Sequence, residues 1–168
     1  QLLAQHENAD AVYKKLVKEY TLNPDGSWDY HEEKQLELLS HFSFHRLYGE
    51  TFIVYNPDYQ DLEIDYAYTI MRDGKRVETP ENAFNKVLPR GAANAPAYAH
   101  LREMVVTHTG LEVGAVIHLG YTLKNKQNYS PAFMGREVIG ENSPVEEMEL
   151  RVVVSEDKEL THKTYNIR

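Results

Sequence analysis

The sequence predicts an all-β protein, namely an antiparallel β-sandwich of about nine strands with at most one or two short helices. Two observations lead to this fold class. Several runs of residues alternate between apolar and polar side chains, which is the pattern of a strand with one buried and one solvated face. Turn-forming residues separate these runs, whereas helical periodicity is confined to two short segments. Hairpins of one-sided strands with few helices indicate two packed sheets.

Two short turn sequences predict β-hairpins. NPDG at 23–26 lies between KLVKEYTL and SWDYHEEKQLELL, and RDGK at 72–75 lies between a tyrosine-rich strand and RVE. Asn and Asp tolerate the tight backbone of such turns, and Gly supplies a positive φ. Each turn is therefore expected to connect two antiparallel strands.

Three expected strands show a period of two. In LEIDYAYTI, one face is expected to carry Leu62, Ile64, Tyr66, Tyr68 and Ile70. In AVIHLGYTLK, the corresponding set is Ala115, Ile117, Leu119, Tyr121 and Leu123. In EEMELRVVV, it is Met148, Leu150, Val152 and Val154. Because successive side chains point to opposite faces of a sheet, each set predicts the buried face of one strand.

The stretch LREMVVTHTGLEVGAVIHLGYTLKN at 101–125 changes pattern in its middle. Gly110 and Gly114 bracket three residues there, and glycine tolerates the backbone of a tight turn. The stretch is therefore interpreted as a third hairpin, in which REMVVTH and AVIHLGYTLK pair with each other.

Two segments break the strand pattern. LELLSHFSFHRLYGE places Leu38, Phe42 and His45 on one face if it forms a short helix before a strand at 50–55, and APAYAHLRE forms at most one further turn. NAFNKVLPRGAANAPAYAH is rich in Pro, Gly and small residues and predicts a long mobile connection at 84–100. Long ordered loops often carry binding residues, so this connection is a candidate for ligand contact.

Length and charge limit the classes of function. The 168 residues suit one domain, and we expect an N-terminal extension at 1–11 and a single sandwich domain at 12–168. The formal net charge of −8 argues against nucleic-acid binding, which needs a basic face. The one basic cluster is Lys14, Lys15 and Lys18. No apolar stretch approaches the roughly 20 residues of a membrane-spanning helix.

The residues predict neither catalysis nor a cofactor. The absence of cysteine excludes disulfides, thiolate zinc sites and cysteine nucleophiles. No GxSxG elbow, GxxxxGK loop or GxGxxG fingerprint occurs. The carboxylates of Glu63, Asp65, Glu147 and Glu149 occupy polar positions of alternating strands and are expected on a solvated face. A hydrolase with paired carboxylates, which would need two carboxyl groups about 5 to 10 Å apart in a cleft, is the weakest alternative.

Two pairs of histidines are candidate metal ligands. His41 and His45 share a helix face with Glu37 if 37–45 is helical, and imidazole is a common zinc ligand. His108 and His118 become diagonal neighbours on the polar face if the 101–125 hairpin centres on residue 112. A one-residue slip would separate the second pair. Whether either pair binds metal stays open, and histidines of a solvated surface are the favoured interpretation.

The sequence contains twelve tyrosines, a large number of aromatic side chains for a chain of this length. Tyr55, Tyr59, Tyr98 and Tyr129 fall in or beside predicted loops, where flat rings stack on sugars or on a partner's surface. These four are the candidate ligand-contact residues. The tyrosines of the predicted strands are instead expected to pack within the sheet.

Four stretches, in this order, resemble a known family: YTLNPDGSWDYHEEKQLELL, YGETFIVYNPDYQDLEIDYAYTIMRDGKRVE, APAYAHLREMVVTHTGLEVGAVIHLGYTLKN and NSPVEEMELRVVV. They are similar to the uncharacterised domain family found N-terminal to transglutaminase-like domains in exported bacterial proteins. The order of YNPDYQDLEI, DGK, LREMVV and GLEVGAVI is the most specific part of the likeness. The resemblance implies an immunoglobulin-like sandwich, an extracytoplasmic location (periplasmic, cell-surface or secreted), and a longer polypeptide whose cysteine-dependent transglutaminase-like or peptidase-like core follows.

On this basis the chain is expected to be a non-catalytic accessory domain that positions or recruits substrate for a downstream transglutaminase-like domain. The family's catalytic Cys, His and Asp belong to that downstream domain, so no catalytic, cofactor or metal residue is assigned here. The alternative is a stand-alone glycan-binding module that uses the loop tyrosines, and a cell-envelope protein is a further class of ligand. Both an excised domain and a stand-alone member fit a chain that opens on QLLAQHENADAVY and stops at Arg168.

Overall fold

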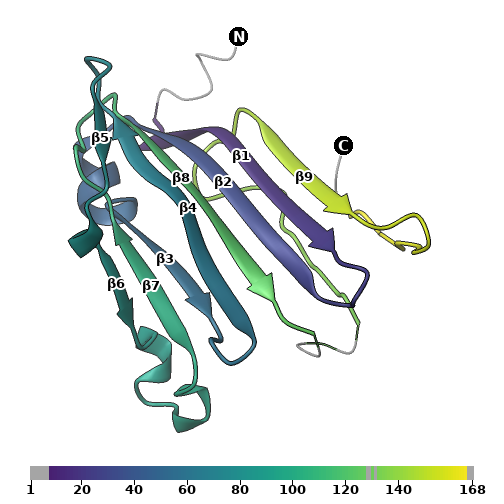
Figure 1. The fold of residues 1–168 in the computed structure, drawn as a ribbon. Helices are drawn as coiled ribbons and strands as arrows, with labels where there is room; N and C mark the ends of the chain where they lie inside the picture. Colours follow the sequence, from purple (N-terminus) through teal and green to yellow (C-terminus); the bar gives the residue numbers. More distant parts are fainter. Residues whose placement is uncertain (1–7, 128–129, 131, 166–168) are drawn as a thin grey trace.

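The computed structural model describes residues 8–127, 130 and 132–165, and within them the chain is an all-β sandwich of nine strands in two sheets (Figure 1). The strands of the large sheet are β1 (Ala11–Leu22), β2 (Trp28–Leu38), β4 (Gln60–Ile70), β5 (Arg76–Glu78), β8 (Val116–Asn125) and β9 (Met148–Val153). Their order is β5-β4-β8-β2-β1-β9. All neighbours are antiparallel except β1 and β9, which run parallel.

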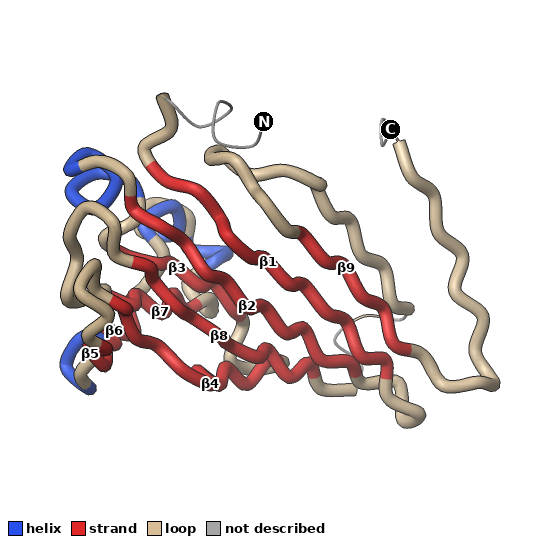
Figure 2. Tube along the Cα trace, turned by 90° about the horizontal axis from the view of Figure 1, so that it is seen from above, coloured by secondary structure: helices blue, strands red, loops and turns tan. Residues whose placement is uncertain are grey.

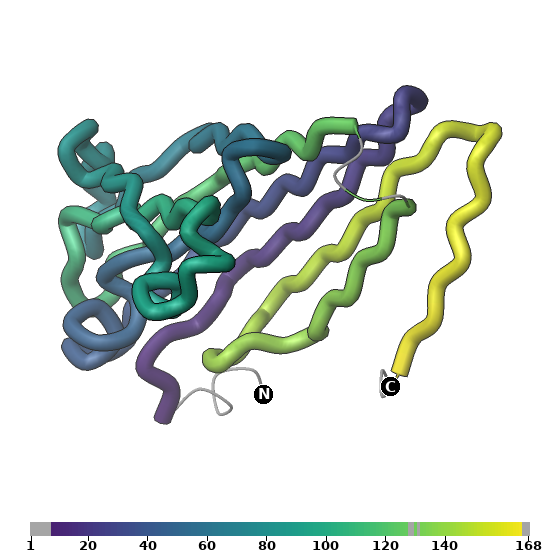
Figure 3. The backbone as a smooth tube through the Cα atoms, turned by 90° about the horizontal axis from the view of Figure 1, so that it is seen from below, coloured from purple at the N-terminus to yellow at the C-terminus, as the bar shows by residue number. Residues whose placement is uncertain are grey.

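The small sheet consists of β3 (Glu50–Tyr55), β7 (Arg102–Thr107) and β6 (Phe84–Val87), in that order and all antiparallel. It covers only part of one face of the large sheet (Figure 2). Residues 132–145, which we name the strap, run back beneath the large sheet on the side of β1 and β9 (Figure 3). The predicted two-sheet sandwich is confirmed, while its immunoglobulin-like character and the expected domain start at residue 12 stay predictions.

Helical structure in the described part of the chain is confined to short turns. They are the π-helical turn η2 (Ser43–Leu47) and the 3-10 turns η3 (Glu81–Ala83), η4 (Arg90–Ala92) and η5 (Pro96–Tyr98). The segment 84–100, which the sequence predicts to be a loop, instead begins with β6, because 84–87 pairs with β7. None of the helices within the described residues has the length and apolar character that crossing a bilayer would require.

Apolar side chains from both sheets form the core. Ile53 and Val106 of the small sheet pack with Leu119 and Leu123 of β8. The period of two predicted for this strand is confirmed, because the five alternate residues are all buried: Ala115, Ile117, Leu119, Tyr121 and Leu123. Full burial of one large aliphatic side chain stabilises a fold by about 1.5–3 kcal/mol, so this face of β8 makes a large contribution.

The face predicted for β4 is correct only in its first half. The register with β8 shifts between Ile64 and Tyr66, which makes Asp65 the extra residue of a β-bulge. Ile64 packs against the core, whereas Tyr66 lies over Gly120 on the outer face of the sheet. Tyr68 follows on the same outer face and stacks on a histidine. One extra residue in a strand moves every later side chain to the opposite face, which a strict period of two misses.

Two of the three predicted hairpins are confirmed. Gly26 and Gly74 have φ values of 88° and 86°, and the turns at 23–26 and 72–75 join β1 to β2 and β4 to β5. The amides of Gly26 and Gly74 donate to the carbonyls of Asn23 and Met71 at 3.1 and 2.9 Å. These bonds close the turns as the Asn, Asp and Gly residues predict.

The third hairpin prediction, at 101–125, is wrong. β7 lies in the small sheet and β8 in the large sheet, so residues 108–115 cross from one sheet to the other. Gly110 and Gly114 do have positive φ values of 70° and 88°, and the chain reverses there as expected. The sequence pattern marks a reversal but does not tell whether the next strand pairs in the same sheet or packs about 10 Å away in the facing one.

Candidate functional site

A set of polar side chains lies on the inner face of the large sheet, where the small sheet and the strap both approach it. We name it the inner polar cluster: Lys18, Tyr20, Tyr30, Glu32, Lys34, Thr51, His108, Tyr121, Glu137 and Glu141. The strand β2 explains part of it, because Leu36 and Leu38 are fully buried and every second residue before them shares their face. Glu32 and Lys34 are therefore directed inward.

A hydrogen-bonded chain links the two sheets within this cluster. The Lys34 Nζ donates to Thr51 Oγ1 at 2.7 Å, and Thr51 Oγ1 lies 2.8 Å from His108 Nε2. Burial, together with the charge of Lys34, lowers the pKa of His108 to about 3, so the imidazole is neutral. Because Lys34 donates to its oxygen, the Thr51 hydroxyl can donate its own proton to Nε2. In that arrangement the imidazole proton lies on Nδ1, a buried atom without a hydrogen-bond partner in the described chain.

Burial also lowers the pKa of Lys34, to about 8, although the nearby carboxylates of Glu32 and Glu141 oppose this shift. An ammonium group in such a place loses most of its hydration, and one hydroxyl acceptor replaces only part of it. Lys34 is therefore a charged residue that the fold tolerates at a free-energy cost.

The carboxylate of Glu32 accepts hydrogen bonds from two tyrosines, one on its own strand β2 and one on the neighbouring strand β8. The hydroxyls of Tyr30 and Tyr121 donate to Glu32 Oε2 at 2.6 and 3.1 Å. Burial raises the pKa of both phenols, and the charge of Glu32 adds to the rise. These tyrosines remain protonated and act as donors that satisfy a carboxylate between the sheets.

The strap is fixed to β1 by the remaining members of the cluster. Lys18 Nζ lies 3.2 Å from Glu137 Oε2 and 3.4 Å from Glu141 Oε1, and the Tyr20 hydroxyl donates to Glu137. At the start of the strap, the ring of Phe133 packs edge-on against Tyr20, with centroids 5.4 Å apart. Ion pairs and ring contacts together hold the strap over the part of the inner face that the small sheet leaves open.

The inner polar cluster does not form a catalytic triad. Thr51 and His108 have the spacing of a hydroxyl nucleophile and its base, but no carboxylate orients Nδ1 in the described residues. The imidazole is also only 5% exposed, so a substrate atom could not reach it without movement of the sheets. The bonding pattern is that of a network which joins the two layers and the strap.

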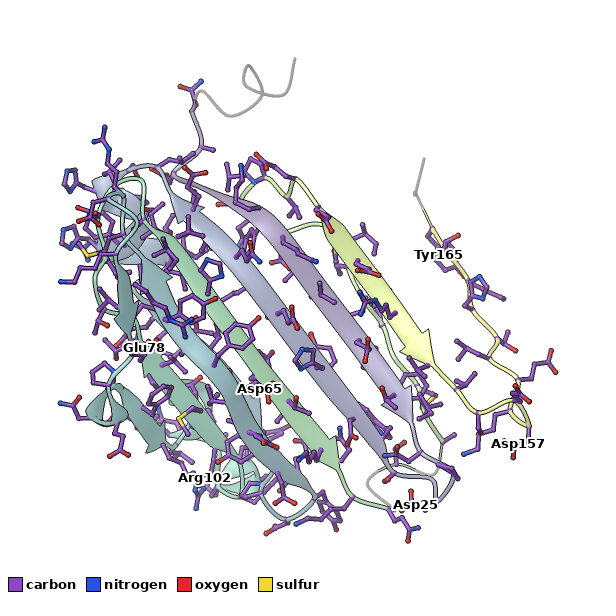
Figure 4. The ribbon with its side chains drawn as sticks, turned by 45° about the horizontal axis from the view of Figure 1, so that its top comes forward. Asp25, Asp65, Glu78, Arg102, Asp157 and Tyr165 are labelled. Carbon is purple, nitrogen blue, oxygen red and sulfur yellow. The ribbon has the colours of Figure 1, made fainter. Side chains whose placement is uncertain are left out.

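The outer face of the large sheet carries a dense array of charged and polar side chains in contact with one another. His31 lies 3.0 Å from Glu33 Oε1 and 3.2 Å from Asp65 Oδ2, and Asp65 appears in Figure 4 over the strands of this sheet. Lys124 pairs with Glu63 at 2.5 Å. The carboxylates of Glu63 and Asp65, which the sequence places on a solvated face, therefore do lie there.

The basic cluster expected from the sequence is neutralised by glutamates. Lys14 pairs with Glu146 at 2.7 Å, and Lys15 lies 3.8 Å from Glu147. Lys18 points to the opposite face of β1 and contacts the strap. The positive charges of β1 are therefore paired with carboxylates and do not form one basic patch.

The four candidate tyrosines do not come together in one site. Tyr55 is only 5% exposed and belongs to the core, so its ring does not lie at the surface where a ligand contact was expected. The reason is that it ends β3 on the inward face rather than beginning the loop. Tyr59 and Tyr98 are 45% and 57% exposed. Tyr129 lies outside the described residues.

Neither histidine pair has the arrangement expected of it. His41 and His45 are exposed and stack with ring centroids 6.4 Å apart, but Glu37 lies in β2 and pairs with β1, so 37–45 is not a helix. His108 is buried between the sheets, whereas His118 lies on the outer face and stacks on Tyr68 at 4.7 Å. The crossing between sheets separates this second pair. In the described part of the chain, no group of three or more His, Asp or Glu side chains could hold a metal ion.

The fold and its inner network define an all-β sandwich without an assembled catalytic or metal centre in the residues described. The chain belongs to the DUF3857 family, described as a domain of unknown function with solved structure, whose model matches residues 24–168. No curated protein matches the sequence.

Two solved structures resemble the chain to very different degrees. It is similar to the crystal structure of a "putative protease" from Parabacteroides distasonis, with 50% identity, a TM-score of 0.82, and coverage of 85% of this chain but 28% of that one. The chain thus spans less than a third of that protein. The CBM3a-L domain from the scaffoldin cipA of Clostridium thermocellum matches with 14% identity, a TM-score of 0.40 and coverage of 77% and 79%, and a likeness this low carries no argument.

Proposed function

We propose that this chain is a non-catalytic accessory domain that acts outside the cytoplasm, where it positions or recruits substrate for a transglutaminase-like domain of the same polypeptide. The observation that carries the proposal is the relative at 50% identity, in which the matched region makes up only 28% of a protein named as a putative protease. More than two thirds of that relative lies outside the matched region, which leaves room for a separate catalytic domain.

The residues of the chain itself support a non-catalytic role. Without cysteine, it cannot supply the nucleophile of a cysteine-dependent transglutaminase or peptidase. Its buried polar groups are used to join two sheets and a strap, as in the bonds of Lys34 to Thr51 and of Lys18 to Glu137. The transglutaminase-like neighbour and the extracytoplasmic location come from the resemblance of YNPDYQDLEI, DGK, LREMVV and GLEVGAVI to the exported family.

The size and location of the native polypeptide test this proposal. Fractionated source cells are blotted with an antibody raised against this domain, and we expect a band much larger than 19.4 kDa in the envelope or secreted fraction. The gene is then expressed with residues 12–168 deleted, and loss of substrate turnover or of correct location is expected. A band near 19.4 kDa, or a deletion that changes neither activity nor location, would overturn the accessory role.

A glycan-binding role is the second candidate, because Tyr59 and Tyr98 are both exposed at one end of the small sheet. Tyr59 lies in the turn after β3, and Tyr98 ends η5, shortly before β7. Because the end of β3 pairs with the start of β7, both tyrosines lie near the same end of the small sheet. Exposed tyrosine rings are suited to stacking on sugar rings.

Titration of the domain with cell-envelope and dietary polysaccharides tests this candidate. We expect Tyr59→Ala and Tyr98→Ala to weaken any binding, whereas Tyr165→Ala, at a residue that is 77% exposed and elsewhere in the fold, leaves it unchanged. Flat titrations, or equal effects of all three substitutions, would exclude the tyrosines as a sugar platform.

A further inference from the structure

The small sheet differs from the large one in carrying large apolar side chains on its outer face as well as on its inner face. TFIVY in β3 and MVV in β7 are nearly continuous apolar runs, whereas the strands of the large sheet alternate with charged residues. A continuous apolar run is the pattern of a strand that is buried on both faces. In this sandwich, however, the core covers only the inner face of these strands.

The outer face of the small sheet is defined by the strand register. Phe52 of β3 lies beside Val105 of β7, and Val54 lies in the next row, which ends with Val87 of β6. The side chains of Phe52, Val54 and Val87 are 56%, 47% and 40% exposed. We name Phe52, Val54, Val87 and Val105 the apolar outer face. Two more exposed apolar side chains, Leu88 and Tyr98, lie in the connection that follows β6.

This surface contrasts with the outer face of the large sheet in the same molecule. There, ion pairs such as Lys124 with Glu63 and Arg151 with Glu19 cover the strands. The outer face of the large sheet is therefore a solvated surface. On the small sheet, Phe52, Val54 and Val105 are neighbours, whereas Glu103 lies between Val54 and Val87. Exposed apolar side chains grouped on regular strands indicate an interaction surface instead.

We propose that the apolar outer face docks against the catalytic part of the same polypeptide, so that the small sheet is the middle layer of the intact protein. The inference rests on the proposed accessory function. In the relative at 50% identity, more than two thirds of the chain lies outside the matched region and supplies a neighbour large enough to cover this face. The partner surface is apolar at its centre, with Lys or Arg at its rim.

The charges within the patch favour this occupant over a second copy. Glu50 lies at one end of β3, and Glu103 separates Val54 from Val87 in their row. A two-fold dimer through this face would place the Glu50 and Glu103 carboxylates of both copies in one interface, and like charges at an interface are unfavourable. A different surface can instead place cations against Glu50 and Glu103.

Thiol labelling measures the docking directly, because the chain has no cysteine of its own. Val54→Cys reports on the apolar outer face, and Val153→Cys on β9 is a matched control with the same residue type and the same 47% exposure. Each substitution is made in the 168-residue chain and in the complete gene product, and alkylation of the tryptic peptide is followed by mass spectrometry. In the isolated chain both thiols are expected to react at similar rates.

In the complete product we expect alkylation at position 54 to slow by about tenfold or more, with little change at position 153. Equal rates at position 54 in the isolated chain and in a demonstrably longer product would overturn the docking surface while leaving the accessory function intact. Slowing at position 54 in the isolated chain that grows with protein concentration would assign the face to a second copy and overturn the proposal. A gene product of only 19.4 kDa would overturn the accessory function and this inference together.

Discussion

Replacing Lys34 by methionine is expected to stabilise the protein at neutral pH. Methionine has a similar length and fills the same space between the sheets without a charge. The hydrogen bond from Lys34 to Thr51 is lost, but the Thr51 hydroxyl can still donate to His108. The substitution therefore removes a buried charge and leaves no buried hydroxyl without a partner.

The magnitude follows from the pKa of the amine. Burial lowers the pKa of Lys34 from 10.5 to about 8, and each pKa unit corresponds to about 1.4 kcal/mol, so the charged form costs about 3 kcal/mol in the folded state. The lost hydrogen bond offsets about 1 kcal/mol of this gain. We therefore expect Lys34→Met to raise the free energy of unfolding by about 1–3 kcal/mol at pH 7.

The pH dependence separates this cause from a general packing effect. The folded pKa of Lys34 lies below its unfolded value, so the unfolded chain binds more protons between pH 8 and 10.5 and the wild type gains stability as pH rises through that window. The advantage of Lys34→Met is then constant below pH 8 and shrinks toward pH 10.5. Contributions of the tyrosines are common to both proteins and cancel in the difference.

Urea unfolding followed by the fluorescence of Trp28, the single tryptophan, measures the difference from pH 6 to 10.5. Trp28 packs against Phe133 at a centroid distance of 5.5 Å, so its emission reports on the strap as well as on the sheet. Lys124→Met, at an exposed lysine paired with Glu63, is the control and should change stability little at any pH. A less stable Lys34→Met protein at pH 7, or an advantage that does not depend on pH, would refute the reasoning.

Three further predictions concern the core and the sheet. The pKa of His108 falls from 6.5 to about 3 on folding, so the free energy of unfolding should drop as pH falls through that window. His108→Phe should flatten this part of an acid-unfolding curve, and an unchanged curve would contradict a neutral buried imidazole. Leu119→Ala should destabilise the protein by about 2–5 kcal/mol in urea unfolding, whereas Leu150→Ala, at a residue 41% exposed, should cost less than about 1 kcal/mol. Similar losses for the two variants would contradict the assignment of Leu119 to the core. Gly120→Val should lower the free energy of unfolding by about 1–3 kcal/mol, because a Cβ there would lie 2.6 Å from the ring of Tyr66. Adding Tyr66→Ala should restore part of the loss, and no restoration would argue against that contact.

Sequence analysis predicted less of the candidate site than of the fold. The polar residues Glu32 and Lys34 sit in SWDYHEEKQLELL among other charged residues, and their inward direction follows only from Leu36 and Leu38, which end the strand on the buried face. Counting back in steps of two from those leucines was the signal that could have found them. Their partners Thr51 and His108 are distant in sequence, so no local pattern joins them.

The sequence by itself determined the class of fold, the two tight hairpins and the buried face of β8, because these depend on side-chain alternation and on turn residues that act over a few positions. Only the tertiary structure decided which strands share a sheet, that Asp65 forms a bulge which turns Tyr66 outward, and that residues 108–115 cross between layers. Those choices depend on packing between segments far apart in the chain. The same packing brings the buried lysine, threonine and histidine together and leaves the outer face of the small sheet uncovered.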